Sequence, residues 1–109
     1  MRTELGRISK VYMGFTGYQD LMFGLGLTIE GKAFSVFTSI CGGWTTEVGE
    51  FTKWTEQDRL LAHGKACVEV TEIMKKAKVS CVDELKNKPV ECTFDGNLLK
   101  SWRILEEVL

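Results

Sequence analysis

His63 and Cys67 are the first pair of residues whose types and spacing could do chemistry. His63 is the only histidine, and Cys67 follows it by one helical turn, so the two side chains would share a helix face. An imidazole and a thiol at this spacing could ligate a metal or form a nucleophile–base pair. A structural zinc site needs two more ligands, and the other cysteines form no Cys-x-x-Cys pair. The pattern therefore favours a histidine packed in the core and predicts no bound metal, no cofactor and no enzymatic activity.

A Gly-rich segment, Cys-Gly-Gly-Trp-Thr-Thr over residues 41–46, is the best candidate for ligand binding. Gly42 and Gly43 leave the backbone free to present N–H groups, and Trp44 offers a stacking surface. Thr45 and the start of the following helix could add donors for a nucleotide or another anion. The spacing matches neither phosphate-binding loop motif. A strand end with Trp44 folded back onto a small core explains the same residues, and this alternative stays open.

Two other places add candidate contacts. Residues 17–20 form a predicted turn that carries an aromatic ring and two polar groups, and the alternation of the last strand puts Trp102 and Arg103 on opposite faces. Three tryptophans exceed what the core of such a small domain needs, and interfaces are enriched in Trp and Arg. The predicted ligand- or partner-binding residues are Tyr18, Gln19, Asp20, Gly42, Gly43, Trp44, Thr45 and Arg103.

The elements that must position these residues divide the chain in two. Nine of the eleven glycines precede residue 50, which predicts strands and turns in the first half. We expect strands over residues 5–15, 21–30 and 33–41, with Val11, Met13 and Phe15 on one face of the first strand and Ile8 and Tyr12 on the other. In the second strand, alternation predicts a buried face formed by Leu21, Phe23, Leu25, Leu27 and Ile29.

The second half predicts a long helix and a closing hairpin. Thr55-Glu-Gln-Asp58 is typical of a capping box, and lysines gather near residue 76 as the helix dipole prefers. A short helix is expected over residues 80–87, before Pro89. Two further strands, 90–94 and 99–105, flank the turn Asp95-Gly96-Asn97. The apolar stripe expected on the long helix comprises Leu60, Leu61, His63, Ala66, Cys67, Val70, Ile73, Met74 and Ala77.

The sequence thus predicts one α+β domain over residues 1–109: a three-stranded antiparallel meander, a long amphipathic helix packed on the sheet, a short helix and a C-terminal β-hairpin (βββ-α-ββ). A net charge of −1 disfavours a nucleic-acid binder. A polar N-terminus and the lack of a long apolar run predict a cytoplasmic protein without a membrane span. The four cysteines are then expected to be free buried thiols.

Several stretches, including residues 17–20, 42–44, 53–59, 89–97 and 100–105, resemble small accessory proteins of tailed phages and prophages. The resemblance runs along the whole chain but carries no defined activity. It implies a non-enzymatic protein that binds a host protein or sequesters a signalling molecule in the host cytoplasm.

Our leading hypothesis is therefore a phage-type, anti-defence binding protein that inhibits a host defence or regulatory component. It would contact a host protein or sequester a nucleotide-like ligand, and we expect a homodimer. Two alternatives stay open. One is a nucleic-acid accessory protein, and the other is a small hydrolase that uses His63 or a cysteine.

Overall fold

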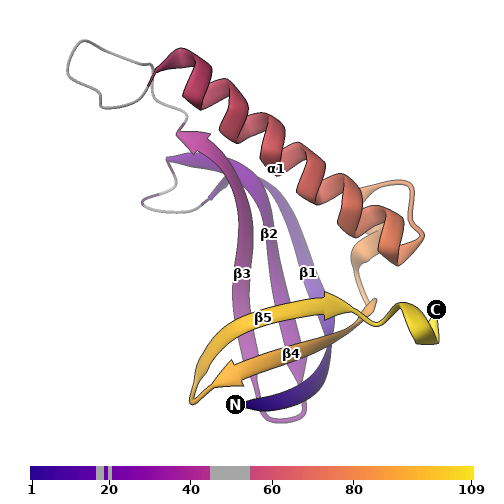
Figure 1. The fold of residues 1–109 in the computed structure, drawn as a ribbon. Coiled ribbons are helices and arrows are strands. Elements are labelled where there is room, and N and C mark those ends of the chain that lie inside the picture. Colours follow the sequence, from indigo (N-terminus) through magenta and orange to yellow (C-terminus); the bar gives the residue numbers. More distant parts are fainter. Residues whose placement is uncertain (17–18, 20, 45–54) are drawn as a thin grey trace.

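A five-stranded antiparallel sheet and one long helix make up the fold (Figure 1), which confirms the α+β class. The computed structural model describes residues 1–16, 19, 21–44 and 55–109, with Gly43 and Trp44 described through their backbone. The elements follow one another as β1 (Arg2–Thr16), β2 (Met22–Gly31), β3 (Ser35–Trp44), α1 (Glu56–Ala77), the 3₁₀ helix η2 (Val82–Leu85), β4 (Pro89–Asp95), β5 (Leu98–Ile104) and the 3₁₀ helix η3 (Glu106–Val108).

Strand β1 joins the two parts of the sheet, whose strand order is β3-β2-β1-β4-β5. Residues 6–16 of β1 pair with β2, and residues 2–7 pair with β4. The sheet is strongly curled, so that the β4–β5 hairpin crosses in front of the lower part of β1–β3 (Figure 1). Helix α1 packs mainly against β3. We call the sheet face beneath α1 the inner face and the opposite one the outer face.

A β-bulge in β1 corrects one prediction. The register shifts between Ile8 and Lys10, so Ile8 pairs with Ile29 while Val11 pairs with Leu27. An extra residue reverses the alternation of side chains. Ile8 therefore lies fully buried on the inner face with Leu27 and Ile29, and the prediction that it shares a face with Tyr12 is wrong.

The inner face of β2 is buried only along its second half. Leu25, Leu27 and Ile29 are fully buried, whereas Phe23 is 39% exposed and Leu21 is half-buried. The alternation in this strand is confirmed, but the buried face is shorter than expected. The core as a whole comprises Ile8, Leu25, Leu27, Ile29, Val70, Ala77, Leu85, Val90, Cys92, Phe94 and Ile104.

Helix α1 begins with the expected capping box. The Thr55 hydroxyl accepts from the Asp58 N–H at 3.1 Å, and the Asp58 carboxylate accepts from the Thr55 N–H at 3.0 Å. Ala66, Val70 and Ala77 are the buried positions of the helix. Leu60 and Leu61 are 59% and 64% exposed, so their place in the buried stripe is not confirmed. Within the described residues, no helix combines the length and the apolar character needed to cross a bilayer.

Two smaller expectations also change. The segment after α1 makes a four-residue 3₁₀ helix, η2, so the short α-helix predicted over residues 80–87 is not confirmed. All four cysteines are free thiols, but only Cys92 is buried. Cys41 is half-buried on the edge strand β3, whereas Cys67 on α1 and Cys81 just before η2 are exposed.

The close packing at Gly24 gives a test of the fold. A Cβ atom at Gly24 would lie 2.0 Å from the Ile40 carbonyl oxygen, at the irregularity where β2 pairs with β3. Because this contact is with backbone, Gly24→Ala must shift β3, and we expect a loss of roughly 1–3 kcal/mol of unfolding free energy. Urea denaturation followed by circular dichroism would measure it.

Gly64→Ala is the matched control. Gly64 lies within α1, and a Cβ there meets no atom within 4 Å. The same substitution should therefore stabilise the protein by up to about 1 kcal/mol through helix propensity. Equal effects of the two substitutions would contradict the packing described for Gly24.

Candidate ligand-binding groove

A groove opens on the inner face between α1 and the two edge strands of the sheet, β3 and β5. It encloses about 340 Å³, which is within the range of small-molecule sites, roughly 300–1,000 Å³. The groove exists because the curl of the sheet brings β5 near the helix that rests on β3 (Figure 1). Its lining residues, which we call the α1–β5 groove, are Ile40, Val68, Glu69, Glu72, Ile73, Lys76, Trp102, Arg103 and Ile104.

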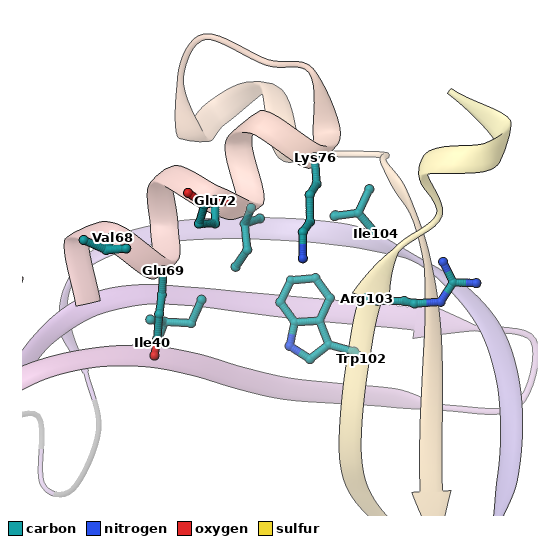
Figure 2. A pocket seen from close by; sticks show the side chains of 9 residues that line it. Ile40, Val68, Glu69, Glu72, Lys76, Trp102, Arg103 and Ile104 are labelled. Atoms are coloured by element: carbon teal, nitrogen blue, oxygen red, sulfur yellow. The ribbon is translucent and has the colours of Figure 1, made fainter. Parts of the chain in front are cut away.

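Trp102 provides the largest flat surface in the α1–β5 groove. Its indole extends from β5 beneath α1, toward the side of the groove where β3 supplies Ile40 (Figure 2). The ring is half-buried and packs against the core, while Ile104, two residues on, is only 2% exposed. Trp102 is thus held in place on one side and open to the cavity on the other.

The charged residues of the groove come from α1. Lys76 extends from the helix toward the Trp102 ring, and Glu69 extends toward Ile40 (Figure 2). Glu72 is engaged by Lys75, with 3.6 Å between the Lys75 Nζ and the Glu72 carboxylate. Positions 69, 72 and 76 share one side of the helix by their three- and four-residue spacing. The arrangement offers one cation and one acceptor above an apolar floor.

Arg103, a predicted binding residue, lines the groove, but its guanidinium points away from it (Figure 2). It lies 3.1 Å from the Glu91 carboxylate and forms two hydrogen bonds of 3.0 Å with Glu107. Hydrogen bonding to this guanidinium lowers the pKa of Glu107 to about 2. Arg103 therefore ties β4, β5 and η3 together on the outer face, and its charge is already paired.

Cys92 lies directly across from Trp102 in the β4–β5 ladder and is fully buried. Burial disfavours the thiolate, and the carboxylates of Glu4 and Glu91 add to the effect, which raises the pKa of Cys92 to about 11. This buried thiol is thus neutral and unreactive at physiological pH, in contrast to the activated cysteine that a nucleophilic mechanism needs.

A second cavity of about 270 Å³ lies between the first half of α1 and the sheet. Gly42 permits the close approach of the two layers, since a Cβ at this position would lie 3.2 Å from the His63 Cα. The His63 Nδ1 lies 2.8 Å from the Arg59 carbonyl oxygen; this nitrogen therefore carries the ring proton, because a carbonyl only accepts. Apart from His63, Cys67 and Thr71, the lining is Met13, Phe23, Gly24, Ile40, Gly42, Ala66 and Val70.

This second cavity brings together His63 and Cys67, but nothing in its geometry activates the pair. The thiol is exposed on the helix surface, and the imidazole is bonded to its own helix. Across the described residues, no three His, Cys, Asp or Glu side chains are grouped so that they could hold a metal ion.

The remaining predicted site residues are scattered. Gln19 is exposed in a left-handed conformation with φ of 52°, and Gly43 and Trp44 extend β3 by two residues beyond Gly42. Tyr18, Asp20 and Thr45 lie outside the described residues. Of the five predicted positions that the structure describes, only Arg103 lies at the α1–β5 groove and only Gly42 lies at the second cavity.

Sequence reasoning missed Lys76 and Glu69, and it singled out Trp102 only as the neighbour of Arg103. A signal was present in the spacing of residues 69, 72, 73 and 76, which places charged groups beside the apolar stripe of the helix. The residues of the sheet that face these charged groups depend on how far the sheet curls, and the local sequence does not determine that curl.

Comparison with protein-family models, curated proteins and solved structures gave no significant match to this chain.

Thiol labelling tests the placement of the cysteines. We expect iodoacetamide at neutral pH to modify Cys67 and Cys81 quickly and Cys92 only after unfolding, as measured by peptide mass spectrometry. Rapid labelling of Cys92 in the folded protein would contradict its burial in the core.

The stability of the protein should depend on pH through Cys92. Because the pKa of Cys92 is raised from 9.0 to about 11, its contribution to stability should be present below pH 9 and be lost as the pH rises through about 11.

Proposed function

We propose that this protein is a non-enzymatic binding protein that sequesters a small nucleotide-like ligand in the α1–β5 groove. The observation that carries the proposal is the half-buried Trp102, which faces a cavity of about 340 Å³ with Lys76 extended toward its ring. A fixed aromatic surface beside a cation matches a planar base joined to a phosphate.

The groups around the cavity give each part of such a ligand a partner. The base stacks on Trp102 and contacts Ile40 and Ile73 at its edges. The phosphate meets Lys76, whose ammonium group makes no ion pair with another described residue. Glu69 accepts hydrogen bonds from a ribose hydroxyl or an exocyclic amine. No step of this scheme needs a nucleophile or a general base.

The balance of charged side chains in the groove narrows the class of nucleotide that would bind there. One lysine faces the groove, while two carboxylates, Glu69 and Glu72, stand on the same helix side. Several phosphates in a row would therefore be repelled, because like charges at short range disfavour each other. The groove fits a ligand with one negative charge per nucleotide, as in a cyclic phosphodiester, better than a nucleoside triphosphate.

The resemblance to phage accessory proteins supplies the biological setting of the proposal. By removing a nucleotide signal in the host cytoplasm, such a protein would block a host defence or regulatory pathway without contacting its enzymes. A protein bound through the same groove is the alternative occupant, and the following experiment separates the two.

Native mass spectrometry of protein purified gently from a bacterial host would show a retained mass of nucleotide size. Calorimetric titration with a cyclic dinucleotide, a cyclic mononucleotide and a nucleoside triphosphate should rank the triphosphate last. Trp102→Ala should weaken binding roughly 5- to 150-fold, which corresponds to about 1–3 kcal/mol for one stacked base. Lys76→Ala, at an exposed position of α1, should weaken binding and reduce its salt dependence.

Two controls match these variants. Tyr12→Ala removes an exposed aromatic ring from the outer face, and Lys65→Ala removes another exposed lysine of α1 that does not line the groove. Both should bind as the unmodified protein does. Absence of binding to all three probes, or equal losses in Lys76→Ala and Lys65→Ala, would overturn the proposal.

A further inference from the structure

Strand β3 forms an edge of the sheet that carries no charge. It pairs only with β2, so its other side has no neighbouring strand in the described part of the chain. No charged residue occurs between Lys32 and Glu47. Proteins usually protect edge strands with charges, prolines or coverings, because an uncharged edge pairs readily with another strand.

The opposite edge, β5, shows such protection. It carries Lys100 and Arg103, and Arg103 is bound by Glu91 and by Glu107 from η3. The β5 edge therefore carries paired charges, whereas the β3 edge carries none. By this contrast, β3 is the edge that is suited to pairing with another strand.

The hydrogen-bond pattern shows which groups of β3 lack partners. The Gly31 N–H donates to the Phe34 carbonyl at 2.9 Å at the start of the β2–β3 ladder. Bonded pairs alternate in antiparallel sheets, so Val36 and Thr38 bond to β2 while the N–H and C=O groups of Ser35, Phe37 and Ser39 face outward. Among described residues, these outward groups make no backbone hydrogen bond with another element.

The order of residues around Phe37 is nearly the same in both directions. The segment reads Ser35-Val36-Phe37-Thr38-Ser39, with serines at the ends, β-branched residues next and phenylalanine in the centre. In an antiparallel pair about a two-fold axis, a strand meets its own reversed sequence. We propose that β3 pairs with β3 of a second copy of this chain, with the two-fold axis at Phe37.

This register gives each side chain a suitable neighbour. Ser35 stands opposite Ser39 of the second copy, Val36 stands opposite Thr38, and the two Phe37 rings meet on the outer face. Phe37 is 60% exposed and lies across Gly26 beside Tyr12, which is 51% exposed, so the pairing also covers apolar surface. A charged partner strand would gain no ion pair here, which favours a second copy over an acidic or basic peptide.

Sedimentation velocity over a range of concentrations tests the dimer. We expect the unmodified protein to sediment as a dimer and Phe37→Lys to sediment as a monomer, because the substitution places two like charges opposite each other. Phe15→Lys is the matched control, since Phe15 is also 60% exposed but lies away from β3. It should remain a dimer. A monomeric unmodified protein, or equal effects of the two lysines, overturns the proposal.

Disulfide formation tests the register. In a background where Cys41, Cys67 and Cys81 are replaced by serine, Phe37→Cys should cross-link two copies under mild oxidation, because directly opposed residues have Cα atoms about 5.5 Å apart. Ser35→Cys alone should not, whereas Ser35→Cys combined with Ser39→Cys should. Cross-linking by Ser35→Cys alone would place the axis elsewhere and overturn the proposed register.

The dimer is independent of the ligand proposed for the α1–β5 groove. Phe37 points to the outer face and does not line the groove. Phe37→Lys should lose the dimer and bind the ligand with unchanged affinity, whereas Lys76→Ala should lose ligand affinity and remain a dimer. The two measurements therefore distinguish failure of the dimer proposal from failure of the ligand proposal.

Discussion

The fold depends on the double pairing of β1. One continuous strand bonds to β2 along residues 6–16 and to β4 along residues 2–7, so a single backbone carries both parts of the curled sheet. The bulge near Ser9 increases the local twist and turns Ile8 into the core, where it meets Ile29. The Ile8 carbonyl and N–H also bond to Asn87 and Lys88, which fixes the entry to β4 at the same point.

The groove is a consequence of this curl and of the place where α1 rests. Gly42 lets the first half of the helix approach β3 closely, while the second half leaves β3 and runs toward η2 (Figure 1). The β4–β5 hairpin, turned by the curl, reaches the space that the helix leaves. Trp102 and Lys76 therefore line the same groove although they belong to elements that are far apart in sequence.

The local parts of the fold could be predicted, and the long-range parts could not. The capping box at Thr55, the turn at Gly96 and the alternation through Leu25 and Leu27 depend on neighbouring residues, and the structure confirms them. The face of the sheet on which Ile8 lies depends on a β-bulge, and no residue type in β1 indicates where this bulge occurs. Lys76 could be assigned to a helix side, but its partner across the groove depends on the curl of the whole sheet.

Strand β3 connects the two proposed surfaces through the period of its side chains. Alternate residues of a strand face opposite ways, so Val36 and Ile40 pack inward while Phe37 faces outward. Ile40 lines both the α1–β5 groove and the second cavity. The inward residues of β3 therefore belong to the proposed groove and Phe37 belongs to the proposed dimer. Because the two sets lie on opposite faces, a substitution on one face can be tested without altering the side chains of the other.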